Sequence, residues 1–234
     1  MQLRSLHRWS VCLMNALLLC PFLSAGTALP QNAAGRGLPA MATLTSAVDR
    51  TNDAMNLKLT LRVYNYAKID SASLSSSEKV ADAIFHKIGI EALWVNCPLS
   101  EQQVTLYPAC LSLMGTSDLV VKILPLRMAA KLHRSNDPLG FAQTCSESEP
   151  ACELNIFDHP IEELATHGYR ADRIMGYAFA HEIAHVLIGR AHSDEGIMRA
   201  AWTAADLQRI SLGLALDFTP AQSSQLQCSA MRRN

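Results

Sequence analysis

The sequence predicts one α+β domain of about 180 residues, a usual size for a single domain. Three observations support this prediction. A strand, a helix and a second strand follow one another early in the chain, and more strands come before a helix rich in histidine. A capping box and a Thr-Pro pair then open helices in the C-terminal part. Strands that are followed by a helical tail are typical of an α+β fold.

The composition is that of an ordinary globular protein. The chain has 234 residues, a formal net charge of -1, and 49% hydrophobic and 18% charged residues. These values provide enough apolar residues for a good core. The charge balance gives no indication of a nucleic-acid partner.

The N-terminus resembles a secretory signal peptide over residues 1–28. Arg4 and Arg8 precede an apolar run, 11–23, that is too short to cross a bilayer. Small residues follow this run and predict cleavage after Ala28. We therefore expect a secreted or periplasmic protein without stable membrane insertion after cleavage. The alternative is an uncleaved membrane anchor.

The rest of the chain divides into two parts. Residues 29–55 are rich in Ala, Gly, Pro and Thr, which predicts a linker or a short pro-segment. Residues 56–234 form the predicted domain. Exported proteins commonly contain disulfides, and sequence neighbours suggest the pairs Cys97–Cys110 and Cys145–Cys152, which leaves Cys228 unpaired.

The domain begins with a predicted strand–helix–strand unit. Apolar and polar residues alternate over 57–64, as in a half-buried strand. Ser75 and Glu78 have the spacing of a capping box, which predicts a helix that ends at Gly89. Residues 90–95 form the second strand. Such a crossover favours a parallel pair.

Short elements follow before the histidine-rich segment. They are a strand at 119–124, one or two helical turns at 128–133, a turn at 136–138, an extended segment at 139–144, a strand at 152–157 and a helix at 161–166. These assignments rest on β-branched content, turn residues and helical spacing.

Three helices are expected after these elements. Asp172 is the predicted N-cap of a helix whose inner face carries Met175, Ala178, His181, His185 and Ile188. Thr203 and Asp206 form a capping box for a helix that we expect to continue through Leu216. Thr219-Pro220 starts a last helix, with proline in its tolerated first position.

The segment His181-Glu182-Ile183-Ala184-His185 contains the His-Glu-x-x-His pattern. The two histidines are one turn apart, about 6 Å along a helix, so both imidazoles can point at one ion. Glu182 is rotated by about 100° and is free to act on water beside that ion as a general base. A catalytic zinc ion typically has three protein ligands and one open position.

Gly189 and His192 complete the candidate site. A glycine in the left-handed conformation often ends a helix, and here it would turn the chain back and deliver His192 as the third ligand. The alternative interpretation is a helix whose histidines are packed in the core. That interpretation leaves Glu182 and the Gly-x-x-His spacing unexplained.

This segment resembles the metzincin clan of zinc metallopeptidases, whose signature is His-Glu-x-x-His-x-x-Gly-x-x-His followed by a Met-turn. The chain departs from the signature once, because three residues, 186–188, separate His185 from Gly189 where the signature has two. His192-Ser193 followed by Ile197-Met198 is most similar to the matrixin branch. The resemblance implies one zinc ion held by His181, His185 and His192, with Met198 beneath it. Plain core packing is the alternative role for Met198.

The family resemblance also implies a fold and a substrate cleft. It predicts a twisted mixed sheet with an antiparallel edge strand, an active-site helix and a helical C-terminal part. The edge strand would pair with an extended substrate, and Gly140, Phe141 and Ala142 are its candidate residues. Trp202 lines the pocket or packs in the core. Asp194 and Glu195 either orient a ligand or are exposed turn residues.

The function expected from these features is that of a secreted zinc metalloendopeptidase that acts on a protein or peptide substrate, with Glu182 as the general base. Two alternatives remain. One is a catalytically idle protein that holds zinc and binds a partner. The other is a zinc amidase that acts on cell-wall peptides.

Overall fold

A computed structural model describes residues 57–234 of the chain except 133–138, 144 and 147. The predicted signal peptide, the predicted linker and the turn predicted at 136–138 lie outside the described residues. No helix of the described part is long and apolar enough to cross a membrane.

A five-stranded sheet with the order β2-β1-β3-β5-β4 forms the centre of the domain. The strands are β1 (Leu57–Asn65), β2 (Ile90–Cys97), β3 (Asp118–Leu124), β4 (Gly140–Ala142) and β5 (Cys152–Phe157). β2, β1, β3 and β5 are parallel, whereas β4 runs antiparallel to β5 at one edge. The predicted α+β class, with a mixed sheet and an antiparallel edge strand, is confirmed.

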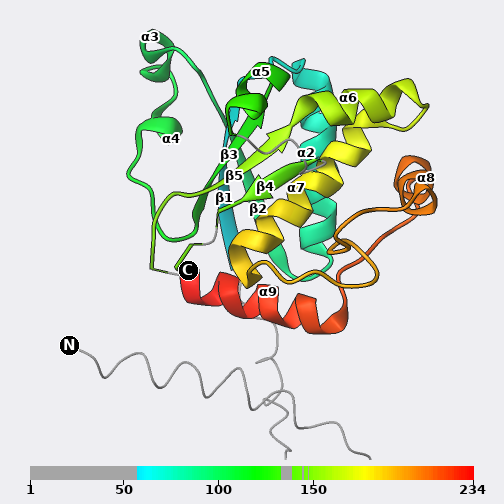
Figure 1. The fold of residues 1–234 in the computed structure, drawn as a ribbon. Helices are drawn as coiled ribbons and strands as arrows, with labels where there is room; N and C mark the ends of the chain where they lie inside the picture. The colour runs from blue at the N-terminus through cyan, green and yellow to red at the C-terminus, as the bar shows by residue number, and fades with distance from the viewer. Residues whose placement is uncertain (1–56, 133–138, 144, 147) are drawn as a thin grey trace, which may run out of the picture. The chain divides into compact units, whose positions relative to one another are not determined.

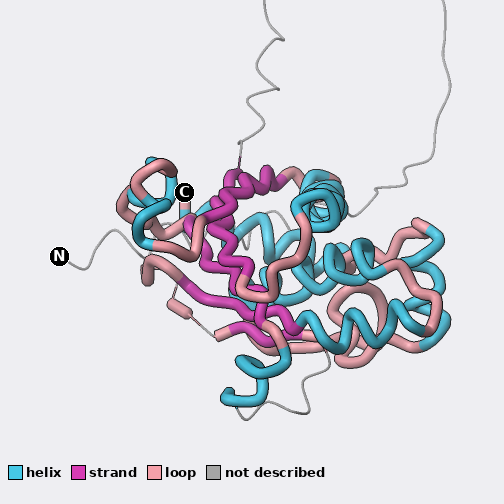
Figure 2. Tube along the Cα trace, turned by 90° about the horizontal axis from the view of Figure 1, so that it is seen from above, coloured by secondary structure: helices cyan, strands magenta, loops and turns pink. Residues whose placement is uncertain are grey.

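Most of the helices lie on one side of this sheet (Figures 1 and 2). The longer helices are α2 (Ser71–His86), α6 (Asp158–Thr166), α7 (Ala171–Ile188), α8 (Ala204–Leu212) and α9 (Pro220–Arg233). The short ones are α3 (Glu101–Val104), α4 (Pro108–Leu111), α5 (Leu126–Ala129) and η1 (Ala130–Leu132). α7 packs against α2, β5 and α9, so the helix that carries the histidine motif lies at the centre of the helical layer.

The alternation in β1 places one row of side chains in the core. Leu59, Leu61 and Val63 are almost completely buried between the sheet and the helices. Arg62 breaks the expected pattern, because it is buried on the opposite face. It forms an ion pair of 3.0 Å with Asp118 and donates to the carbonyl of Ser112. A buried charge is tolerated there because it is paired and hydrogen-bonded.

The start of α2 corrects one prediction. The helix begins at Ser71, because Asp70 is the N-cap and its carboxylate accepts from the backbone N–H groups of Ala72 and Ser73. Ser75 and Glu78 therefore lie inside the helix and do not form a capping box. Glu78 instead accepts a hydrogen bond from Asn96 on β2.

Two further helix ends differ from the sequence predictions. α7 has Arg170 at its N-cap position, and Asp172 makes an ion pair with Arg170 instead of capping. α8 opens with the predicted Thr203–Asp206 capping box but ends at Leu212, before the predicted Leu216. It ends there because Gly213 adopts the left-handed conformation, with φ 78° and ψ 16°. The predicted start of α9 at Pro220 is confirmed.

Two predicted disulfides are present. Cys97–Cys110 joins the end of β2 to α4, and Cys145–Cys152 joins the segment after β4 to the start of β5. The second disulfide closes the hairpin that holds the edge strand in place. Cys228 is also disulfide-bonded, so the prediction that it remains unpaired is wrong.

Candidate metal centre

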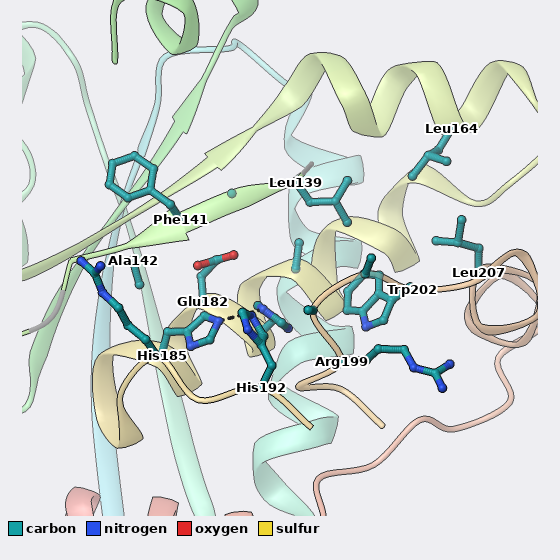
Figure 3. A pocket seen from close by; sticks show the side chains of 16 residues that line it. Leu139, Phe141, Ala142, Leu164, Glu182, His185, His192, Arg199, Trp202 and Leu207 are labelled. Atoms are coloured by element: carbon teal, nitrogen blue, oxygen red, sulfur yellow. Dashed lines mark hydrogen bonds between the residues drawn. The ribbon is translucent and has the colours of Figure 1, made fainter. Parts of the chain in front are cut away.

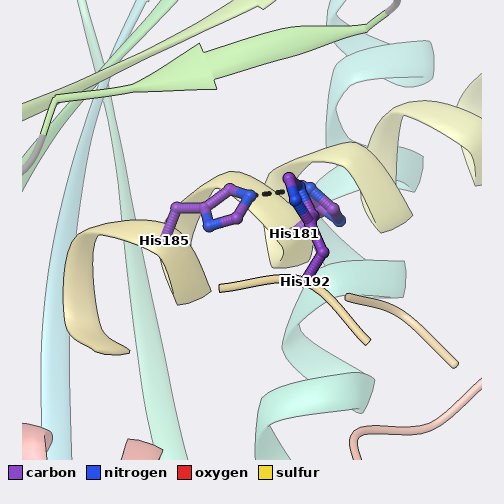
Figure 4. A group of neighbouring side chains, drawn as sticks. All are labelled: His181, His185 and His192. Carbon is purple, nitrogen blue, oxygen red and sulfur yellow. Dashed lines mark hydrogen bonds between the residues drawn. The ribbon is translucent and has the colours of Figure 1, made fainter. Parts of the chain in front are cut away.

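Three imidazoles converge beside α7 (Figure 4). His181 and His185 lie on successive turns of α7, and His192 lies on the loop that follows. One ring nitrogen from each histidine lies within 4.8 Å of the others. The ring centroid of His192 is 5.5 Å from that of His181 and 4.8 Å from that of His185. The structure therefore brings together the three histidines that the sequence analysis selected.

Backbone carbonyls determine the tautomers of the two helical histidines. Nδ1 of His181 lies 2.8 Å from the carbonyl oxygen of Ile197, and Nδ1 of His185 lies 2.9 Å from that of Gly189. A carbonyl oxygen only accepts, so each Nδ1 donates and carries the proton. Each Nε2 then presents a lone pair, which is the form of imidazole that binds metals.

The electrostatics of the pair favour a bound cation. Burial lowers the pKa of His181 to about 4 and also lowers the pKa of His185, although hydrogen bonds to carbonyls partly oppose both shifts. Both rings are therefore neutral at pH 7. Their two Nε2 atoms are 2.9 Å apart, and in this state neither atom has a proton to share. A metal ion at the convergence of the histidines would satisfy both lone pairs, so the donor set fits a divalent metal ion.

Gly189 shows how the chain takes up the extra residue of the motif. The three residues between His185 and Gly189 all belong to α7, which ends at Ile188. The last hydrogen bond at the end of the helix joins the Gly189 N–H to the His185 carbonyl at 3.0 Å. Gly189 then has φ 88° and ψ -170°. The predicted left-handed conformation is therefore wrong in ψ, and the observed region is essentially restricted to glycine. This geometry also turns the Gly189 carbonyl toward His185.

The turn around Met198, which follows the loop that carries His192, also contributes to the site. Met198 is fully buried, and its carbonyl accepts from the Ser193 N–H at 2.9 Å. The preceding residue, Ile197, provides the carbonyl that orients His181. Asp194 and Glu195 are exposed, which agrees with their interpretation as turn residues.

Glu182 lies beneath the edge strand. Its side chain is buried, and Figure 3 shows its carboxylate between β4 and the imidazoles. A Cβ atom built on Gly140 would lie 3.1 Å from Cγ of Glu182 and 2.5 Å from the carbonyl oxygen of Asn155. Glycine is therefore required at position 140, because a Cβ atom would clash with the Asn155 carbonyl on β5, and the Glu182 side chain packs closely below the same position.

A cavity of about 350 Å³ opens over the three histidines (Figure 3). All four candidate substrate-binding residues contribute to its wall: Gly140, Phe141, Ala142 and Trp202. Leu139, at the start of the extended segment predicted at 139–144, also lines the cavity, together with Leu164, Leu207, Arg190 and Arg199, which were not predicted as cavity residues. Leu164 and Leu207 come from two separate helices, so only the fold brings them to the site.

Comparisons with known proteins give little further information. No protein-family model matches the chain, and no curated protein matches it. Among solved structures, archaemetzincin from Methanopyrus kandleri is similar, with 14% sequence identity and a TM-score of 0.44. The match covers 74% of this chain and 96% of that chain. Because identity and TM-score are this low, the function has to be argued from the chain's own residues.

Proposed function

We propose that the protein is a secreted zinc-dependent metalloendopeptidase of the metzincin type, nearest to the matrixin branch. One observation carries the proposal: three imidazole nitrogens converge beside a buried glutamate, in a cavity bordered by a sheet edge. Three neutral imidazoles with one open position form the donor set of catalytic zinc sites. We assign the ligand role to His181, His185 and His192.

The proposed chemistry divides the work between the metal and the protein. Zinc, when bound, supplies a Lewis acid that activates water and polarises a carbonyl. Glu182 accepts a proton from the attacking water at its carboxylate and returns this proton to the leaving amine. Burial beneath β4 keeps the carboxylate close to the reacting atoms and limits its rotation.

We propose that the edge strand orients the substrate. β4 pairs with β5 along one edge, and among the described residues no strand pairs with its other edge. An extended peptide that adds to this edge would bring its scissile carbonyl over the histidines. The apolar wall with Leu139, Leu164 and Leu207 would then accept an apolar side chain next to the cleaved bond.

Export is part of the proposal. The two disulfides Cys97–Cys110 and Cys145–Cys152 fit an oxidising compartment, where such bonds persist. Residues 1–28 have the features of the signal peptide that would deliver the protein there. Localisation of the full-length chain, together with N-terminal sequencing of the mature protein, tests this part.

Replacement of Glu182 by Gln tests the proposed reaction. The variant keeps the shape of the side chain but loses the base, so we expect one zinc ion per chain in both proteins and peptide cleavage only in the wild type. General-base catalysis typically contributes about 10²–10⁴-fold to the rate, so turnover should fall by at least that range. Glu195→Gln, at an exposed position of the following loop, is the matched control and should cleave normally.

Other outcomes select the alternative functions. A zinc-loaded wild type that cleaves no member of a broad peptide library would indicate a catalytically idle protein that holds zinc and binds a partner. Strong preference for cell-wall fragments over denatured protein would indicate an amidase that acts on cell-wall peptides.

A further inference from the structure

The carbonyl oxygen of Ile197 accepts two hydrogen bonds. One comes from Nδ1 of His181 at 2.8 Å, and the other comes from Nε1 of Trp202 at 3.1 Å. A carbonyl oxygen has two lone pairs, so the two donors together saturate it. Ile197 itself is fully buried. The indole of Trp202 thus helps to fix the peptide plane that orients His181.

Ring contacts hold Trp202 against α7. Its ring centroid lies 6.0 Å from that of His181 and 6.1 Å from that of Tyr177, and both contacts are edge-on, at 89° and 90°. Tyr177 is itself held, because its hydroxyl accepts from the backbone N–H of Leu216 at 3.2 Å. Trp202 is therefore packed against two side chains from successive turns of the helix that carries the histidine motif.

Trp202 also belongs to the apolar part of the cavity wall. It lines the cavity together with Leu139, Leu164 and Leu207, and Figure 3 shows these four side chains grouped on one side of the histidines. The same indole thus contacts a histidine of the metal centre and borders the space where a substrate side chain would lie.

We infer that Trp202 is a positioning residue for His181, acting through the Ile197 carbonyl, and that its indole also determines which side chain the apolar wall accepts. The first role concerns metal binding alone. The second rests on the proposed function. Removal of a group that orients a metal ligand typically weakens metal binding by about 10–100-fold.

Trp202→Phe tests the first role, because phenylalanine keeps an aromatic ring but lacks the N–H donor. The matched control is Trp94→Phe. Trp94 packs against Phe179 with ring centroids 5.2 Å apart, and its Nε1 is buried without a hydrogen-bond partner in the described part of the chain. Both variants lose the same atoms from an aromatic cluster, but only Trp202→Phe loses a bond to the carbonyl that orients His181.

Zinc affinity, measured by competition with a chelator on the full chain, is the first readout. We expect about 10–100-fold weaker binding for Trp202→Phe and a change within about twofold for Trp94→Phe. The absorption spectrum of the Co²⁺-substituted protein should shift only in Trp202→Phe, since a merely structural loss would leave the ligand geometry intact. Equal zinc affinities and unchanged cobalt spectra for the two variants would overturn the inference. If Trp202→Phe fails to fold, Trp202→Leu compared with Trp94→Leu provides the test, since leucine also lacks the donor.

Peptide kinetics test the second role. Trp202→Phe should change KM for peptides with a large apolar residue beside the cleaved bond more than KM for peptides with alanine there. Equal changes for both peptides would contradict a role in specificity. If the wild type binds zinc but cleaves nothing, the proposed function fails, while the zinc measurement still decides the first role.

Discussion

The three histidines of the metal centre lie in two contrasting regions. His181 and His185 are on α7, which packs against α2, β5 and α9, and a backbone carbonyl orients each of their rings. His192 is exposed on the loop after Gly189. In the described part of the chain its ring nitrogens have no hydrogen-bond partner, and its contacts are with the other two rings.

This difference separates a preorganised pair of ligands from a ligand that a loop delivers. The pair is neutral and correctly tautomerised before any metal arrives, so ion binding requires little reorganisation of α7. His192 must be held by the ion itself and by the turn between Gly189 and Met198. The extra residue of the motif falls between the two regions, just before Gly189, whose carbonyl orients His185 and whose turn leads to His192.

The largest expected effect is on zinc affinity when a helical ligand is removed. Zinc sites with four ligands bind with about 10–16 kcal/mol, so one ligand is worth about 2.5–4 kcal/mol, or roughly 60- to 700-fold in affinity. We expect His185→Ala to lose at least that much. His192→Ala should lose less, because an exposed ligand without orienting hydrogen bonds loses more freedom when it binds. Chelator competition measures both, and a larger loss for His192→Ala would reverse the comparison.

The metal-free protein should show the effect of the buried pair on stability. The pKa of His181 is lowered to about 4, so between pH 6.5 and 4 the unfolded chain binds a proton that the folded chain does not. Stability is therefore full above pH 6.5 and falls as the pH decreases toward 4, by about 3 kcal/mol for this residue. Urea unfolding of the metal-free protein at several pH values measures the slope. His181→Gln should flatten it, and an unchanged slope would contradict the assigned burial effect.

Gly189→Ala tests the connection between the two regions. The positive φ disfavours alanine by about 1–3 kcal/mol, whereas a Cβ atom there would meet no atom within 4 Å. We expect a loss of stability in that range and weaker zinc binding, through His192 and the carbonyl that orients His185. Gly115→Ala is the control, since it has neither a positive φ nor a close neighbour. Wild-type zinc affinity in Gly189→Ala would show that the turn does not position the ligands.

The smallest effects are expected from the carboxylates of the loop. Asp194 and Glu195 are exposed, and the hydrogen bonds that their positions accept from Arg199 and Ser193 are made by backbone oxygens. Alanine at either position should change stability by no more than about 0.5 kcal/mol and zinc affinity by about twofold. A tenfold loss of zinc affinity would assign one of these carboxylates a role in orienting His192.

The sequence was informative where function depends on side chains at regular spacing. His181 and His185 could be predicted, because the helical period relates sequence to direction in space. The edge strand could be predicted only through the family resemblance of the histidine motif. The orienting groups could not, because Ile197 and Gly189 contribute backbone carbonyls, which no residue type identifies. The start of α2 was missed because Ser75 and Glu78 have capping-box spacing, whereas the carboxylate of Asp70 caps a helix that already begins at Ser71. Arg62 was missed because its partner, Asp118, lies on another strand.

X-ray absorption at the zinc edge tests the central claim most directly, since it counts the imidazoles bound to the ion. We expect three histidine ligands in the wild-type protein and two in His192→Ala. Two ligands in the wild type, with a spectrum that His192→Ala leaves unchanged, would show that the loop histidine does not bind zinc and would contradict the proposed site.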